Sequence, residues 1–137
     1  MSESKKTVLF LCTHNSCRSQ MAEGLLNAMY PDRFKAFSAG IQKKTVNPNA
    51  LQVMKEIGID ISMHYSKLIT DFQGKEFDYV VTVCDNVKET CPYFPGKHVI
   101  HKSFQDPSSF KGDADETLII FRRVRDEIKF WIEKEFG

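Results

Sequence analysis

The sequence predicts an α/β protein in which a parallel, doubly wound, four-stranded sheet is flanked by helices in three layers. Three observations predict this fold. Short runs of apolar and β-branched residues alternate with longer amphipathic segments, and the first two helical segments end at a proline or a glycine. The length of 137 residues suits one core. We therefore expect a single domain over residues 1–137.

Each element has a local signal. The first strand is an apolar run of the kind that is buried on both faces, and Pro31 ends the helix that follows, because the residue before a proline disfavours helical angles. Asn47 is a helix N-cap with Pro48 at the first helical position, and Gly58 ends that helix. Strands are predicted at 7–11, 34–39, 77–83 and 98–102, and helices from Ser19 to Pro31, from Asn47 to Gly58 and from Asp115 to Phe136.

Composition excludes several classes of protein. A hydrophobic content of 42% with 27% charged residues excludes a disordered chain, and a mean hydropathy of -0.34 without a long apolar run excludes a membrane span. The net charge of +1 gives no general attraction to nucleic acid or to a membrane surface, so any anion site must be local. The polar start of the chain is not a signal peptide, so we expect a cytoplasmic protein with reduced cysteines.

Chemically active residues follow three of the predicted strands. Cys12 ends the first strand, Cys84 ends the third, and Asp106 lies a few residues past the fourth. Ligands of open α/β sheets bind beyond the carboxyl ends of the strands. This coincidence predicts a redox or nucleophilic site at that edge.

The segment CTHNSCRS, between a strand and a helix N-terminus, has the properties of an anion-binding loop. Its backbone N–H groups and the helix dipole favour negative charge, and the guanidinium of Arg18 can bind two oxygens of a tetrahedral oxyanion. The same field favours the thiolate of Cys12, to which Ser19 can donate a hydrogen bond, and Asn15 suits a left-handed turn. We expect the oxyanion to be bound by Thr13, His14, Asn15, Ser16, Cys17, Arg18 and Ser19.

A nucleotide site and a zinc site both fit this segment less well. A nucleotide P-loop needs glycines and a Gly-Lys pair, which the segment lacks, and a zinc ribbon needs closer cysteine pairs than Cys12 with Cys17 or Cys84 with Cys91. A buried structural cysteine beside a surface Arg18 is the remaining alternative. We therefore expect neither a metal nor a cofactor. Three histidines are expected to be surface or strand residues: His64, His98 and His101.

Several motifs together carry a resemblance to a known family: CTHNSCRSQMAEG, SAG, NPNA with IGIDIS, VVTVCDNVKETCP, DPSSF and RVRDEI. The chain resembles the thioredoxin-coupled arsenate reductases built on the low-molecular-weight protein tyrosine phosphatase fold, from about Val8 to the final helix. The resemblance implies that Cys12 attacks arsenate, that Arg18 and Asn15 hold it, and that Asp106 protonates the leaving oxygen. Phosphate and sulfate are the expected competitors.

The resemblance also identifies Cys84 and Cys91 as resolving thiols. Reduction of As(V) to As(III) takes two electrons, which two thiols supply when they form a disulfide. Cys84 would attack the sulfur of Cys12 and release arsenite, and Cys91 would then attack Cys84 and carry the disulfide outward to thioredoxin. Cys17 is left over, and we expect it to be a packing residue.

Two other functions remain open. A low-molecular-weight phosphotyrosine phosphatase would use Cys12, Arg18 and Asp106, but hydrolysis does not need Cys84, and such phosphatases typically have proline where this chain has Gln20. An oxyanion-binding module without catalysis is the other alternative, although the nucleophile and the acid are both intact.

Two further expectations concern a cation and a conformational change. Some members of the family bind potassium near the loop, and Asn15, Glu23 and Ser38 match the potassium ligands. Lys67 stands at the position of the acidic ligand, so we expect the Lys67 ammonium group to replace the ion.

If residues 84–91 are helical when reduced, the end cysteines lie about 10.5 Å apart along the axis. A disulfide needs Cα atoms within about 4.4–6.8 Å, so this segment must unwind.

Overall fold

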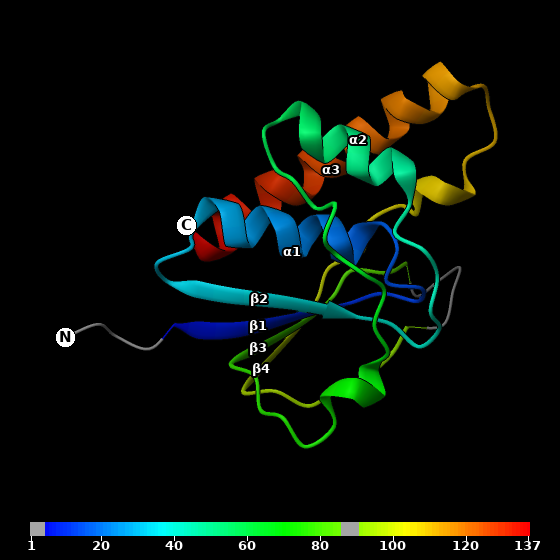
Figure 1. The fold of residues 1–137 in the computed structure, drawn as a ribbon. Coiled ribbons are helices and arrows are strands. Elements are labelled where there is room, and N and C mark those ends of the chain that lie inside the picture. The colour runs from blue at the N-terminus through cyan, green and yellow to red at the C-terminus, as the bar shows by residue number, and fades with distance from the viewer. Residues whose placement is uncertain (1–4, 86–90) are drawn as a thin grey trace.

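The computed structural model describes residues 5–85 and 91–137, which form a four-stranded parallel sheet in the order β2-β1-β3-β4 (Figure 1). Its four parallel strands confirm the predicted fold class. The strands are β1 (Lys6–Leu11), β2 (Phe34–Ala39), β3 (Tyr79–Thr82) and β4 (His98–His101). The α-helices are α1 (Arg18–Met29), α2 (Pro48–Glu56) and α3 (Ala114–Phe136).

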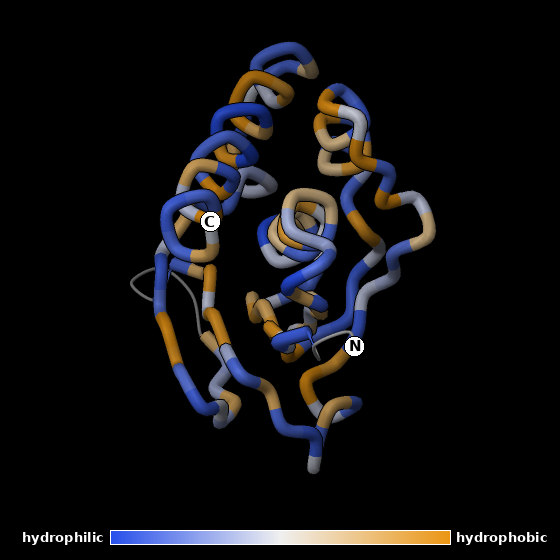
Figure 2. Tube along the Cα trace, turned by 90° about the vertical axis from the view of Figure 1, so that its left-hand side faces the viewer, coloured by the Kyte–Doolittle hydropathy of each residue, from blue (hydrophilic) through white to orange (hydrophobic). Residues whose placement is uncertain are grey.

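All three α-helices cover one face of the sheet (Figures 1 and 2), where α1 packs against the sheet, α2 and α3, and Phe136 at the end of α3 contacts Phe34 and Tyr79. Because α1 is enclosed in this way, most of its first eight residues are buried, polar ones included. The larger core cluster lies in this layer. It contains, among others, Val8, Phe10, Met21, Leu25, Val53, Met54, Val81, Phe121, Val124 and Ile128.

The opposite face of the sheet is covered by a short 3₁₀ helix, η1 (Ile69–Phe72), and by an irregular segment after Cys91. Phe72, Phe77 and Phe94 pack there against the strand residues Leu9, Leu11 and Val80, and adjacent rings meet edge to face. The third layer is therefore an aromatic cluster rather than an α-helix, and η1 is an element that the sequence analysis did not predict.

Most element boundaries fall within one or two residues of the prediction. The side chain of Asn47 accepts a hydrogen bond from Asn49 N, and Gly58 has a left-handed φ of 79°, as expected for the two ends of α2. Strand β3 is shorter than predicted, because the Asp78 carboxylate accepts from Thr7 N at 2.9 Å and Phe77 turns into the aromatic cluster.

Among the residues that the structure describes, no helix has the length and apolar character needed to cross a membrane.

Candidate active site

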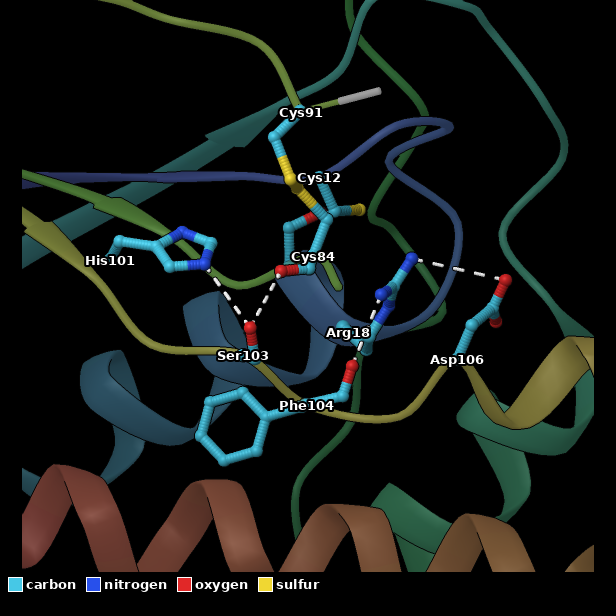
Figure 3. The surroundings of a disulfide bond; sticks show 9 residues. Cys12, Arg18, Cys84, Cys91, His101, Ser103, Phe104 and Asp106 are labelled. Carbon is cyan, nitrogen blue, oxygen red and sulfur yellow. Dashed lines mark hydrogen bonds and ion pairs between the residues drawn. A yellow bond between two sulfur atoms is a disulfide. The ribbon is translucent and has the colours of Figure 1, made fainter. Parts of the chain in front are cut away.

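The three segments that the sequence singled out meet at the carboxyl edge of the sheet (Figure 3). Strands β1 and β3 are neighbours, and Val83 N donates to Leu11 O at 2.9 Å, so the two chains that continue to Cys12 and Cys84 leave the sheet side by side. Phe104 N in turn donates to Val83 O at 3.3 Å, which brings the segment before Asp106 to the same edge.

The loop between β1 and α1 is shaped by the turn after β2. The backbone N–H groups of Ile41 and Gln42 both donate to Thr13 O, at 2.9 and 3.1 Å. Gly40 permits this close approach: a Cβ there would lie 2.7 Å from Thr13 O and 2.9 Å from Cys12 O. Sequence reasoning did not assign this role to Gly40, and its only signal was the SAG motif.

Cys12 is 2% exposed, and its sulfur lies 2.8 Å from Ser19 Oγ. Asn15 Nδ2 donates to the same hydroxyl oxygen at 2.8 Å, so the Ser19 proton is available for Cys12. Asn15 has a φ of 51°, the left-handed conformation that the sequence predicted. The site therefore contains a buried sulfur with a hydroxyl group held beside it.

Arg18 is 2% exposed and joins the loop to the segment that carries the acid. Its Nη1 donates to Phe104 O at 3.2 Å, and its Nη2 lies 3.8 Å from Asp106 Oδ2 (Figure 3). The other carboxylate oxygen, Asp106 Oδ1, accepts from Ser108 N and Ser108 Oγ at the start of a second 3₁₀ helix, η2 (Pro107–Ser109). One oxygen of the carboxyl group is thus fixed by the turn while the other faces the guanidinium.

Cys84 and Cys91 form a disulfide with Cα atoms 6.0 Å apart, whereas Cys12 and Cys17 are free. Figure 3 shows the disulfide beside Cys12. Cys84 is fully buried and Cys91 is half-buried, so Cys91 is the more exposed residue of the pair. The unwinding expected if residues 84–91 are helical when reduced concerns mainly residues 86–90, which lie outside the described residues.

Cys17 behaves as the sequence analysis expected of a packing residue. Burial raises the pKa of its thiol to about 12, a rise that the hydrogen bond with Ser16 only partly opposes. It therefore stays protonated at neutral pH.

Lys67 points its ammonium group at the residues that match the family's potassium ligands. Nζ lies 3.7 Å from Glu23 Oε1 and donates to Tyr65 O at 2.9 Å, while Ser38 Oγ donates to the same Glu23 oxygen. The charge that a potassium ion would supply is thus already present, and these residues do not fit the ion. Within residues 5–85 and 91–137, no three His, Cys, Asp or Glu side chains are grouped to hold a metal.

The sequence did not identify Gln20 and His64 as residues of the site. Gln20 Nε2 donates to Asn15 Oδ1 at 3.0 Å and to Tyr65 O at 3.0 Å, and Gln20 Oε1 lies 3.0 Å from His64 Nδ1. His64, expected to be a surface or strand residue, is half-buried and lies outside the strands. The other two histidines lie exposed on β4, as expected: His98 and His101.

Comparison with known proteins places this geometry in a family. The low molecular weight phosphotyrosine protein phosphatase family matches residues 7–135. An arsenate reductase of Halalkalibacterium halodurans is 48% identical over 125 residues, 90% of either chain. The solved structure of an arsenate reductase in its oxidized state has a TM-score of 0.79 at 30% identity, covering 94% of this chain and 95% of that one.

A further solved structure is that of a thioredoxin-dependent arsenate reductase of Corynebacterium glutamicum. It has a TM-score of 0.67 at 27% identity, and the match covers 98% of this chain and 65% of that one. With a family match over almost the whole length and a close relative of equal extent, the chain belongs to the low molecular weight phosphotyrosine protein phosphatase family.

Proposed function

We propose that the chain is an arsenate reductase that passes two electrons to arsenate through three cysteines and is regenerated by thioredoxin. The observation that carries the proposal is the Cys84–Cys91 disulfide beside Cys12. A hydrolase with this loop needs one nucleophilic thiol, whereas a reductase needs two more thiols within reach of it. The arsenate reductases among its relatives support the same assignment.

The first step is nucleophilic attack of the Cys12 thiolate on arsenic. A Cys12–arsenic bond forms, and one arsenate oxygen leaves with a proton. Arg18 binds two of the remaining oxygens together with the loop N–H groups, and Asp106, whose free oxygen faces Arg18, is the group placed to give the proton. Phosphate and sulfate would compete for the loop because they share the tetrahedral shape and the negative charge.

The second step is attack of Cys84 on the sulfur of Cys12. The Cys12–arsenic bond breaks and its electron pair stays on arsenic, which leaves as arsenite, so As(V) becomes As(III) and two thiols become one disulfide. The neighbouring positions of Cys12 and Cys84 at the ends of β1 and β3 support this step.

The third step is attack of Cys91 on Cys84, which frees the Cys12 thiolate and leaves the disulfide found here. The more exposed Cys91 is the residue that a dithiol protein such as thioredoxin can reach. Both electrons then come from thioredoxin, so the cycle needs no metal or bound cofactor. A thioredoxin partner agrees with a cytoplasmic location, where thiols are kept reduced.

A phosphotyrosine phosphatase is the second candidate, because the family is named for that activity and Cys12, Arg18 and Asp106 suffice for it. The disulfide favours the reductase, since oxidation of Cys84 and Cys91 has no part in hydrolysis. Gln20, in place of the proline typical of such phosphatases, points the same way.

A coupled assay decides between these functions. Arsenate is added to the protein with thioredoxin, thioredoxin reductase and NADPH, and absorbance at the NADPH band is followed; the release of phosphate from p-nitrophenyl phosphate is measured in parallel. The reductase is supported by arsenate-dependent oxidation of NADPH that requires thioredoxin. Fast phosphate release without any NADPH oxidation contradicts it and favours the phosphatase, and inactivity in both assays leaves an oxyanion-binding module.

A further inference from the structure

The chain after β4 continues to pair with the chain after β3 as both approach the disulfide. Phe104 N donates to Val83 O at 3.3 Å, which extends the parallel pairing beyond the two strands. At the next carbonyl, that of the fully buried Cys84, the donor is a side chain: Ser103 Oγ donates to Cys84 O at 3.4 Å (Figure 3). The three proposed steps do not use this contact, and a substitution can remove it.

The direction of each hydrogen bond follows from the groups themselves. A carbonyl oxygen can only accept, so the single proton of the Ser103 hydroxyl points to Cys84 O. His101 Nε2 lies 3.1 Å from Ser103 Oγ, and because the hydroxyl proton is already used, His101 is the donor (Figure 3). His101 is the last residue of β4 and pairs with Thr82 of β3, so the sheet anchors it. Each bond in such a chain polarises the next, so His101 strengthens the hold of Ser103 on Cys84.

The position of Cys84 matters because this residue takes part in both thiol exchanges of the proposed function. Its sulfur attacks Cys12 in the second step and is attacked by Cys91 in the third. The chain that continues to Cys84 leaves the sheet beside the chain that continues to Cys12. When the main chain of Cys84 is held there, less conformational freedom is lost as its sulfur meets either partner.

We propose that Ser103 and His101 are positioning residues, which hold the main chain of Cys84 at the end of β3 so that its sulfur exchanges efficiently with Cys12 and with Cys91. The order of the exchanges rests on the proposed function, but the hold on the disulfide does not. The two side chains contact Cys84 O and each other, whereas the loop of residues 12–19 forms the anion site. Loss of the Ser103 hydroxyl should therefore impair thiol exchange and leave oxyanion affinity unchanged.

The stability of the disulfide gives a measurement that needs no arsenate. In the oxidised protein Cys84 is held by the disulfide as well as by Ser103, so the hydrogen bond is formed for a larger fraction of the time than in the reduced protein. By linkage, the hydrogen bond then favours the disulfide to the same extent. In mixtures of reduced and oxidised dithiothreitol, the protein disulfide and the dithiol reagent exchange with the protein dithiol and the oxidised reagent. Acid quenching, alkylation and peptide mass mapping give the oxidised fraction of Cys84 and Cys91.

Ser103→Ala removes the hydroxyl from an exposed residue, and Ser62→Ala, on the exposed turn after α2, is the matched control. We expect the equilibrium constant for reduction by dithiothreitol to rise about fivefold in Ser103→Ala, the usual net effect of losing one hydrogen bond. Ser62→Ala and Ser103→Thr, which keeps the hydroxyl, should match the parent. Equal constants for Ser103→Ala and Ser62→Ala, with unchanged circular dichroism, overturn the proposal.

Two replacements of His101 test the second hydrogen bond. His101→Gln retains a side-chain N–H donor for Ser103 Oγ and should keep the parent constant, whereas His101→Phe removes the donor and should raise the constant about twofold. Identical constants for these two variants overturn the role of His101.

Arsenate turnover adds a separate reading. In a single turnover of the reduced protein without thioredoxin, Ser103→Ala should release arsenite about fivefold more slowly, while the inhibition constant for phosphate stays that of the parent. Weaker phosphate binding with an unchanged disulfide equilibrium would place Ser103 in the anion site and overturn the proposal. Because the dithiothreitol equilibrium needs no arsenate, a protein that fails to reduce arsenate still gives a decisive result for Ser103.

Discussion

At the scale of single residues, Cys12 and Cys17 are two buried thiols with different surroundings. They are 2% and 3% exposed and flank the same loop. Burial raises the pKa of Cys17 to about 12, although its sulfur lies 3.6 Å from the Ser16 hydroxyl oxygen. Cys12 instead has the Ser19 hydroxyl at 2.8 Å, and this hydroxyl is itself oriented by Asn15. The two thiols therefore differ in the hydroxyl group beside each sulfur and not in exposure.

Replacement of Cys12 by serine should abolish arsenate turnover and leave the fold intact. A serine hydroxyl has nearly the same shape as the thiol, but it cannot form the covalent arsenic adduct or the disulfide that follows it. The coupled NADPH assay measures the loss, and thermal unfolding of the variant verifies the fold. Steady-state turnover by the folded variant would show that another residue is the nucleophile.

Asp106→Asn should slow the chemical step by roughly 10²–10⁴, the usual contribution of a general acid, with little loss of anion binding. Asparagine retains the oxygen that accepts from Ser108 N and Ser108 Oγ, so the turn stays in place while the proton donor is lost. Asp113→Asn, which changes the N-cap of α3, is the control. Comparison of kcat with the inhibition constant for sulfate separates the two effects, and a collapse of sulfate binding would make Asp106 structural.

Sequence reasoning found the residues of the site that lie in one motif or directly after a strand. Asn15 and Ser19 were assigned conformations or contacts that the structure confirms. It missed Gly40 and His64 because their contacts to the loop cross more than twenty positions of sequence, and the residue types alone carry no sign of a partner. A buried hydrogen-bond network becomes visible only when the fold is known.

At the scale of elements, helices with a hydrophobic period or a capping residue were predictable from the sequence, and short irregular elements were not. The N-cap residue Asn47 and the helix-ending residue Gly58 predicted the two ends of α2 from the local sequence alone. The 3₁₀ helix η1 has four residues, too few to show a period, and its Phe72 packs with Phe77 and Phe94 from other segments. The cover of the second face is therefore a tertiary property, which the local pattern does not contain.

The disulfide segment supports a prediction about the order of thiol exchange. Cys91→Ser should complete one turnover, release arsenite and stop as a Cys12–Cys84 disulfide, since no thiol remains to attack Cys84. Cys84→Ser should stop one step earlier, with arsenic still bound to Cys12. Non-reducing peptide mapping identifies the trapped disulfide, and arsenite is counted per protein chain. Repeated thioredoxin-dependent turnover by the Cys91→Ser protein would contradict the three-thiol relay.

At the scale of the whole molecule, the parallel topology brings the chemistry together. All four strands point the same way, so the chain ends that follow β1, β3 and β4 meet at one edge although Cys12, Cys84 and Asp106 are far apart in sequence. This convergence was predictable from the alternation of strands and helices. The cysteines were expected to start as thiols, and the expected relay ends in the Cys84–Cys91 disulfide that the structure holds.

Lys67 leads to a prediction for the stability of the whole molecule in different salts. Its segment bridges to the end of β2 through Gly40 and Leu68, and its ammonium group faces Glu23 of α1. Because that charge already neutralises Glu23, an added potassium ion would meet repulsion from Lys67. We expect equal melting temperatures and equal kcat in potassium and sodium chloride at matched ionic strength, a condition that removes differences in screening.

The matched variants make this prediction specific. Lys67→Met removes the ammonium group and leaves Glu23 with Ser38 as a vacant cation site, so potassium should now raise the melting temperature above that in sodium, as any ligand that binds only the folded state does. Lys75→Met, on the exposed turn after η1, should respond to neither ion. A potassium-specific rise in the melting temperature of the parent protein would mean that the ion binds despite Lys67, and the assignment of its ammonium as the resident cation would fail.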